Sequence, residues 1–297
     1  MTTDRHVDLL KSTNVRFPGL LRRLMKAGAY LAPGLASRRL AQQFLTPMKA
    51  PTPERERRWI AGAQQHRLRC GDYDLAVSSL GLGGPQILLV HGWSGRGSQL
   101  GAFIEPLVEA GYEVNWFDLP AHGQSSGEQS ALVSARDAVQ TVSEWLGGAH
   151  TVIAHSMGAA ATTLAAARGA EIGRMVYLCP PDDISSFLDA VGQLLGLPES
   201  IVAGARRWIE QSYALRFDEL IPTRVAGDLT QPLLALHDPA DREVRLAEVE
   251  GLVAAWPGAR LELVAGLGHR RILRDPEVIR QVVDFVSAGS ERRKVAA

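Results

Sequence analysis

Six short, uninterrupted apolar runs recur along the chain from residue 86 onwards, and they constrain the fold more than any other feature. Each run is long enough for a strand, and segments with helical periodicity separate the runs. Strands that are apolar on both faces are typical of a parallel sheet covered by helices on both sides. The pattern predicts an α/β fold with a doubly wound, mostly parallel sheet. The predicted strands are QILLVHG (86–92), YEVNWFDLP (112–120), TVIAHS (151–156), RMVYLCP (174–180), PLLALHD (232–238) and RLELVAG (260–266).

Two segments that precede these runs have a different pattern. HRLRCG (66–71) and DYDLAVSSLG (72–81) alternate polar and apolar residues, which is typical of a half-exposed antiparallel pair. With the six runs, they bring the predicted sheet to eight strands. After the last run, Asp275 and Pro276 mark the start of a terminal helix, because Asp is a common N-cap and Pro is favoured at the first helical position.

Residues 1–60 differ from the rest of the chain in charge. They contain twelve Lys or Arg and four Asp or Glu, a net charge of +8, in a chain whose total is zero. Leu, Ala and Arg recur at roughly helical spacing in residues 16–45, and prolines interrupt this segment. We interpret residues 1–60 as an N-terminal helical extension and linker, and residues 61–297 as the main domain. The helices are expected to pack against that domain; contact of residues 16–45 with an anionic membrane surface is the less favoured alternative.

The interval from residue 181 to residue 230 lacks an obvious strand. Large apolar side chains, among them Phe187, Leu188 and Trp208, recur there at near-helical spacing. We predict a small helical lid inserted over the strand ends, with these side chains and the N-terminal helices forming an apolar acyl pocket. An ordinary pair of crossover helices is the alternative.

Composition argues against several classes of protein. A net charge of zero argues against a general nucleic-acid binder. Two cysteines, Cys70 and Cys179, make no disulfide framework and suit a reducing compartment. The first residues lack the apolar core of a signal peptide, and no apolar run reaches the 18 residues needed to span a membrane. We therefore expect a cytoplasmic protein, whose oligomeric state the sequence does not indicate.

Ser156 lies where a predicted strand meets a predicted helix. The segment Ala154-His155-Ser156-Met157-Gly158 approximates the small-x-Ser-x-small elbow, in which a tight turn lifts a nucleophilic hydroxyl above the sheet. A serine that only caps the following helix would occupy the same place.

A nucleophilic serine needs a base and a carboxylate that orients the base. His269 follows the last predicted strand, after Gly266 and Gly268, which let a loop turn back over the sheet. Asp238 and Asp241 follow the strand before it, and either could orient the histidine. The order Ser156, Asp241, His269 is the order that this architecture uses.

Acyl transfer also needs two backbone donors for the oxyanion. The Met157 N–H directly after the serine is one candidate, and the Trp93 N–H in the loop after the first apolar run is the other. We add His155 and Ser94, which flank these positions, to the predicted substrate pocket.

Five segments of the chain resemble, in order, the signature segments of the α/β-hydrolase fold superfamily: LLVHGW, FDLPAHGQSSG, VIAHSMGAA, LLALHDPADREV and GLGHRRIL. The resemblance covers roughly residues 65–288 and implies an eight-stranded α/β-hydrolase fold with a serine triad. The elbow departs from the pattern because Ala154 replaces a glycine. The acid segment departs because Asp238 replaces a glycine; the family's catalytic aspartate is the later one, which implies Asp241.

The resemblance and the residues together predict a serine hydrolase that cleaves a carboxylic ester or related acyl compound, with a small-molecule acyl substrate. C–C bond hydrolases, thioesterases and acyltransferases use the same triad, and a non-catalytic binding module can share the fold. No metal and no organic cofactor is expected. His91 and His122 match loop-shaping positions of the family, and His237 is expected to form hydrogen bonds locally.

Overall fold

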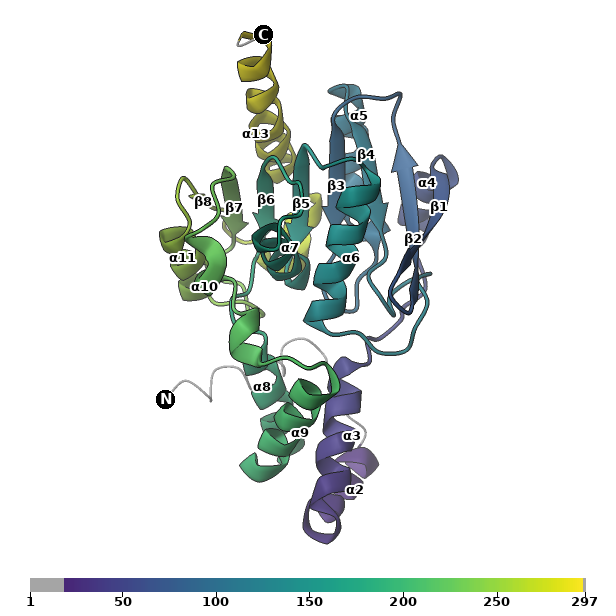
Figure 1. The fold of residues 1–297 in the computed structure, drawn as a ribbon, viewed down its shortest axis with the longest axis vertical. Coiled ribbons are helices and arrows are strands. Elements are labelled where there is room, and N and C mark those ends of the chain that lie inside the picture. Colours follow the sequence, from purple (N-terminus) through teal and green to yellow (C-terminus); the bar gives the residue numbers. More distant parts are fainter. Residues whose placement is uncertain (1–18, 296–297) are drawn as a thin grey trace. The chain divides into compact units, whose positions relative to one another are not determined.

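The computed structural model of the protein describes residues 19–295, so the first three residues of the predicted helical segment 16–45 lie outside it (Figure 1). Eight strands form one sheet in the order β1-β2-β4-β3-β5-β6-β7-β8. The pairs β1–β2 and β2–β4 are antiparallel, and the other five pairs are parallel. The predicted fold class and all eight predicted strands are confirmed. The strands are β1 Gln64–Cys70, β2 Tyr73–Leu80, β3 Gln86–Val90, β4 Glu113–Phe117, β5 Thr151–His155, β6 Met175–Leu178, β7 Leu233–His237 and β8 Arg260–Leu263.

Helices cover both faces of this sheet (Figure 1). Alternate strand residues such as Ile87 and Leu89 pack with α5 and the terminal helix α13, and α6 and α7 contact each other on the opposite face. The Asp275 carboxylate accepts the N–H groups of Glu277 and Val278, which confirms the predicted cap of α13. The helices are α2 Gly19–Leu31, α3 Pro33–Leu45, α4 Glu54–Ala61, η1 Gly97–Phe103, α5 Ile104–Glu109, α6 Leu132–Trp145, α7 Met157–Ala167, α8 Ser185–Leu195, α9 Glu199–Ser212, η2 Phe217–Leu220, α10 Thr223–Ala226, α11 Leu246–Ala255, α12 Gly268–Arg271, η3 Ile272–Arg274 and α13 Pro276–Val295.

The contacts group the described chain into two compact units. The sheet unit comprises residues 47–182 and 222–295, and the helical unit comprises residues 19–46 and 183–221. The predicted domains, 1–60 and 61–297 with a lid at 181–230, stay a prediction, and this grouping differs from them. It places α4 and α10 in the sheet unit, and it joins the N-terminal helices to the inserted helices.

The helical unit is held together by small residues at a close helix crossing. α3 contacts both α8 and α9. A methyl group on Gly204 of α9 would lie 2.3 Å from the Ser37 hydroxyl of α3, so only glycine fits at that position. Leu40 and Ala41 are fully buried on α3, as is Ala205 on α9. Two segments that are 137 residues apart, Thr46 and Asp183 being their nearest ends, thus share one core.

A buried ion pair ties α4 to the sheet unit. The Glu56 carboxylate accepts two hydrogen bonds from the Arg96 guanidinium, at 2.6 and 2.9 Å, and one from the Ser98 hydroxyl at 2.9 Å. Only 3% of the Glu56 side chain and 13% of the Arg96 side chain are exposed. Neither residue can lose its partner without leaving a charge in a low-dielectric site.

We expect Arg96→Met to destabilise the protein by about 3 kcal/mol, because the Glu56 charge would stay buried without its partner. Urea unfolding at pH 7 measures this loss. Arg57→Met is the matched control: Arg57 pairs with Glu54 on the same helix, but both side chains are more than half exposed. That pair should contribute about 0–1 kcal/mol. Equal losses in the two variants would contradict a structural role for the buried pair.

Candidate active site

Ser156 adopts a strained backbone conformation between β5 and α7. Its φ is 51° and its ψ is −127°, in a region that is unusual for a residue other than glycine. Its N–H donates to the Leu178 carbonyl at 3.0 Å, which fixes the turn to the neighbouring strand β6. Such strain persists only where the surrounding structure enforces it, and it is common at functional sites.

Two glycines enforce this turn by close backbone contact. A Cβ atom on Gly158 would lie 2.5 Å from the His91 carbonyl oxygen, and one on Gly92 would lie 2.9 Å from the Ser156 Cβ. The loop after β3 therefore lies directly against the serine. Ala154, in place of the usual glycine, causes no conflict: it is an ordinary residue of β5, paired with Val90 and Tyr177, and its methyl group is fully buried.

The structure brings His269 and Asp241 together from the loops after β8 and β7. The Nδ1 atom of His269 lies 2.8 Å from Oδ2 of Asp241, while Oδ1 accepts the N–H groups of Glu243 and Val244 at 2.6 and 3.2 Å. Burial raises the pKa of the Asp241 carboxyl, but the hydrogen bond and the charge interaction with His269 and the Glu243 N–H outweigh burial and lower its pKa to about 2. Asp241 is therefore a carboxylate at neutral pH.

Asp238, the other carboxylate of this loop, contacts the backbone of the His269 loop rather than the ring. It accepts the Gly268 N–H at 2.5 Å and the Ala240 N–H at 2.8 Å. Burial raises the pKa of Asp238, and these backbone hydrogen bonds bring it below its usual value. The two aspartates thus hold different parts of one histidine segment.

His155, the residue directly before Ser156, also supports His269. Its Nε2 donates to the His269 carbonyl oxygen at 2.8 Å, and the two ring centroids are 4.6 Å apart. His155 is 5% exposed, and burial lowers its pKa well below the usual value, so the ring is neutral. Sequence reasoning placed His155 in the substrate pocket and missed this contact, which links the serine turn to the histidine loop.

Two further buried histidines shape the loop beside Ser156. His91 Nε2 accepts the Leu119 N–H at 2.9 Å, so Nδ1 carries the proton and donates to the Gly92 carbonyl at 2.7 Å. His122 Nε2 accepts the Ser94 N–H at 3.0 Å, and its Nδ1 donates to the Pro120 carbonyl at 2.8 Å. These bonds agree with the loop-shaping positions expected for both histidines.

Two N–H groups of the loop after β3 are engaged: those of Ser94 and Gly95 donate to His122 and to the Gly92 carbonyl. Within residues 19–295, the N–H groups of Trp93 and Met157, the two predicted oxyanion donors, donate no hydrogen bond. Their role at an oxyanion stays a prediction. The predicted pocket residue Ser94 has a φ of 54°, and its hydroxyl accepts the Met48 N–H at 3.0 Å.

A carboxylate that sequence reasoning missed, that of Glu243, lies near Nε2 of His269. Glu243 Oε2 is 3.8 Å from His269 Nε2, and its Oε1 is 3.3 Å from the Arg270 guanidinium. The side chain is 24% exposed. Its position two residues after Asp241, in the same short loop, was the signal in the sequence that could have identified it.

His237 differs from its prediction. Both of its ring nitrogens are buried without a hydrogen-bond partner among the described residues, so the expected local hydrogen bonds are wrong. Cys179, His237 and Asp241 each offer one ligand atom, all within 4.8 Å of one another, and in residues 19–295 they form the one such group. Burial raises the pKa of the Cys179 thiol well above its usual value, and the neighbouring Asp241 carboxylate adds to the effect. Because Asp241 already holds His269, we assign no metal to this group.

The remaining predicted pocket residues belong to the helical unit. Leu188 is buried on α8, Phe187 is half-buried beside it, and Trp208 is half-buried on α9 with the Arg38 guanidinium 5.9 Å from its ring. All three belong to the core or the surface of that unit. That they line an acyl pocket together with Ser94 and His155 stays a prediction.

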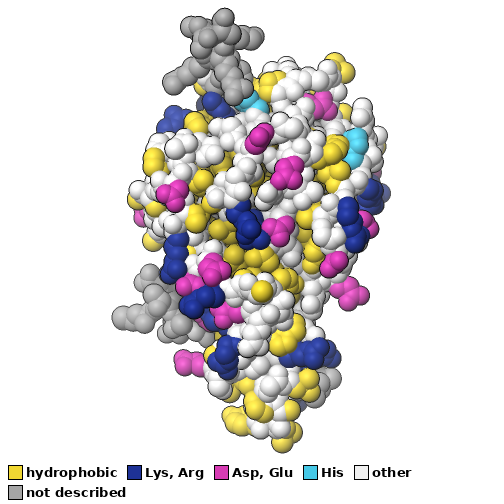
Figure 2. Space-filling view, viewed as in Figure 1, with side chains coloured by type: hydrophobic (Ala, Val, Ile, Leu, Met, Phe, Trp, Pro, Cys, Tyr) yellow, Lys and Arg dark blue, Asp and Glu magenta, His cyan; other side chains and the backbone are white. Residues whose placement is uncertain are grey.

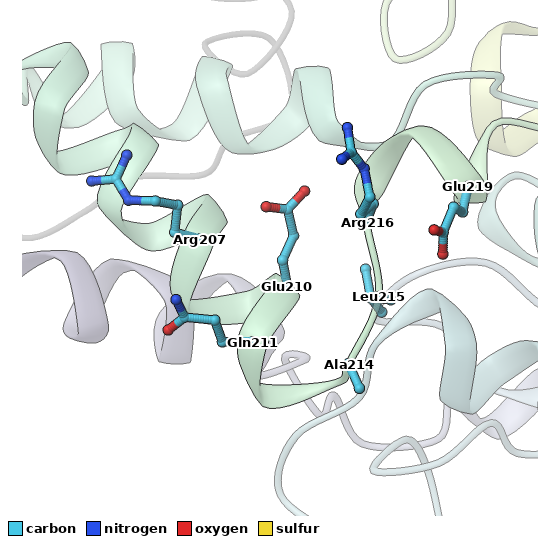
Figure 3. Close-up of a pocket in the computed structure, with 7 residues that line it drawn as sticks. All are labelled: Arg207, Glu210, Gln211, Ala214, Leu215, Arg216 and Glu219. Carbon is cyan, nitrogen blue, oxygen red and sulfur yellow. The ribbon is translucent and has the colours of Figure 1, made fainter.

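The surface of the helical unit carries a shallow hollow of about 300 Å³ (Figure 3). Its lining is rich in charge, with Arg207, Glu210, Arg216 and Glu219 around it. It includes none of the predicted site residues, and its polarity does not suit an acyl chain. We assign no function to it.

Comparisons with known proteins agree with this architecture. The model of a family described as the alpha/beta hydrolase family matches residues 87–282. No curated protein matches the chain significantly. Similar solved structures include the Pyrococcus furiosus esterase Pf2001 (TM-score 0.66, 20% identity, 82% of this chain and 99% of that one) and a putative lipase from Acinetobacter baumannii (0.61, 20%, 80% and 95%). A bromoperoxidase from Bacillus anthracis is also similar (0.59, 17%, 76% and 100%), so the fold alone does not define the chemistry. Among the described helices, none combines the length and the apolar character required to cross a bilayer.

We expect stability to depend on pH through the buried neutral histidines. Burial lowers the pKa of His91 to about 4; burial, followed by the nearby His91, lowers that of His122 to about 3. Below about pH 6.5 the unfolded chain binds protons that the folded protein does not, so each histidine should reduce the unfolding free energy by about 1.4 kcal/mol per pH unit between roughly pH 5.5 and 4. Urea unfolding of wild type and His122→Asn across this range measures it. The variant should lose less stability per pH unit, and equal slopes would contradict a neutral His122.

Proposed function

The chain belongs to the α/β hydrolase family, and we propose that it is a serine hydrolase that cleaves a carboxylic ester or a related acyl compound. The observation that carries the proposal is the strained turn of Ser156, which the close contacts of Gly92 and Gly158 enforce. In residues 19–295, the N–H group of the adjacent Met157 donates no hydrogen bond. A serine that only capped α7 would not need this conformation, and its hydroxyl makes no capping hydrogen bond. The hydrogen-bonded pair His269 and Asp241 supports the same conclusion.

The proposed mechanism uses each group for the role that its surroundings favour. His269 takes the proton of the Ser156 hydroxyl through Nε2, because Nδ1 is engaged by Asp241. The serine attacks the acyl carbon, and the N–H groups of Trp93 and Met157 bind the oxyanion. Asp241 keeps the imidazole in this tautomer and stabilises the imidazolium. His269 then protonates the leaving group, and water releases the acyl group by the same steps.

The choice of an ester over the related acyl compounds is supported by structural neighbours described as an esterase and a putative lipase. Glu243 lies 3.8 Å from Nε2 of His269, the atom that would protonate the leaving group, but the Arg270 guanidinium 3.3 Å from its carboxylate offsets its charge. Glu243 therefore does not separate an alcohol from a thiol as the leaving group.

Labelling with a fluorophosphonate probe tests the nucleophile. Wild type should be labelled, and Ser156→Ala should lose both labelling and at least about 10⁴-fold in kcat on a short-chain ester, because the activated hydroxyl is gone. Ser212→Ala, which removes an exposed serine at the end of α9, is the control and should label as wild type does. Labelling that persists in folded Ser156→Ala, or is absent from folded wild type, would overturn the proposal.

The assignment of the acid has its own test. Asp241→Asn should lower kcat by about 10⁴-fold, because the amide cannot hold His269 in the working tautomer. Asp238→Asn should cost much less activity and mainly stability, because Asp238 accepts backbone N–H groups and does not touch the ring. Steady-state kinetics of both variants, with circular dichroism as the check on folding, measures the difference. A larger loss in Asp238→Asn would show that the earlier aspartate is the acid.

A further inference from the structure

The turn between α2 and α3 presents six consecutive exposed residues without a charged side chain. Residues 30–35 read YLAPGL, and all six are exposed. Tyr30 is 83% exposed, Leu31 is 85% exposed and Leu35 is 64% exposed. Single exposed apolar residues are common on protein surfaces, but a run of this length marks an interaction site or an aggregation hazard. We call residues 30–35 the apolar turn.

The apolar turn is a defined structure between two helices. α2 ends at Leu31, and the Ala32 N–H donates to the Gly28 carbonyl at 2.9 Å. Pro33 is the first residue of α3, where a fixed φ suits a helix start. Other residues of α3, including Ala36, Leu40 and Leu45, are the buried ones. The fold therefore uses a separate set of side chains for packing and leaves those of the apolar turn in solvent.

The helices on both sides of the apolar turn are basic. Residues 19–46 contain five cationic residues and no Asp or Glu. Those whose side chains the structure describes, Arg23, Arg38 and Arg39, are exposed. On the face of the helical unit that Figure 2 shows, hydrophobic side chains gather, with Lys and Arg side chains adjoining them. The five cationic residues are Arg22, Arg23, Lys26, Arg38 and Arg39.

Apolar side chains and cations are separated by the depth of a bilayer interface. Arg38 and Arg39 lie five and six residues beyond Pro33, which corresponds to roughly 8 Å along the helix. Interfacial segments bury their apolar residues about 5–10 Å into the boundary between headgroups and acyl chains. With the apolar turn at that depth, the guanidinium groups reach the level of the lipid phosphates, and Tyr30 occupies the interface that tyrosine prefers.

We propose that the apolar turn docks this protein on the surface of an anionic lipid bilayer, with Tyr30, Leu31 and Leu35 inserted among the lipids and the flanking arginines on their phosphates. A second copy of the chain suits the surface less well, because a symmetric contact would bring two sets of cations together. Monotopic docking of this kind needs no membrane-spanning helix. The proposal is independent of the hydrolase reaction, so a failure of either leaves the other standing.

Flotation of the full chain with vesicles tests the proposal. Wild type should bind vesicles of phosphatidylcholine and phosphatidylglycerol, and bind pure phosphatidylcholine vesicles more weakly. The double variant Leu31→Ser, Leu35→Ser should lower the partition coefficient at least tenfold, because two apolar side chains are lost from the interface. Arg38→Gln with Arg39→Gln should remove most of the preference for anionic vesicles and its sensitivity to salt.

The matched control is Leu82→Ser. Leu82, in the turn between β2 and β3 of the sheet unit, is 103% exposed, at least as much as Leu31 and Leu35, and the residues on either side of it in the chain are not basic. It should leave the partition coefficient unchanged. Circular dichroism and thermal unfolding should be the same in all these variants, because the changed side chains are exposed.

The depth of insertion gives a second measurement. Cys70 and Cys179 are buried, so Leu31→Cys and Leu82→Cys each introduce one accessible thiol for an environment-sensitive fluorophore. Only the label at position 31 should shift to shorter wavelength on anionic vesicles. Three results would overturn the proposal: no binding by wild type, an equal loss in Leu82→Ser, or self-association that Leu31→Ser abolishes in the absence of vesicle binding.

Discussion

The close contact between two backbones, at Gly92 and at Gly158, is the constraint on which the active site depends. Parallel pairing of β3 with β5 brings the ends of these strands side by side, and neither glycine has room for a methyl group. The turn after β5 must then bend sharply, which places Ser156 in its unusual conformation. The loop after β3 is held from its other side by His91 and His122, whose neutral rings accept backbone N–H groups. Strain at the serine is therefore balanced by hydrogen bonds elsewhere in the site.

Three side chains hold His269, and each holds a different part of it. Asp241 binds the ring, Asp238 binds the backbone N–H of the preceding residue, and His155 binds the carbonyl of His269 itself. A histidine fixed at ring and backbone loses little freedom during a reaction cycle, which is what a preorganised site requires. The neutral state of His155 matters here, because a second imidazolium so close to His269 would oppose the charge that the proposed mechanism develops on it.

Two parts of the chain that are distant in sequence form the helical unit. Helices α2 and α3 precede the sheet, and α8 and α9 are inserted after β6, yet Ser37 and Gly204 meet at their crossing. The inserted helices thus share one core with the N-terminal hairpin that carries the apolar turn. The helix faces that bear Leu40 and Ala205 are buried in this packing. Arg38, Arg39 and the apolar turn lie outside it and are exposed.

The sequence by itself determined the strands, the order of the serine, acid and histidine segments along the chain, the cap of α13 and the residues proposed for catalysis. All of these depend on local periodicity and short motifs. The residue pattern alone left Asp238 and Asp241 open and the family resemblance implied Asp241; only the folded loop shows that Asp241 is the one that reaches the ring. The sequence also could not reveal the support that His155 gives to His269, because these two residues are 114 positions apart in the chain. Above all, the sequence predicted that the N-terminal helices pack against the main domain. The structure groups them with α8 and α9, the helices of the predicted lid within that domain. Which residues meet at this helix crossing, such as Ser37 and Gly204, was decided by the tertiary structure alone, because periodicity does not record it.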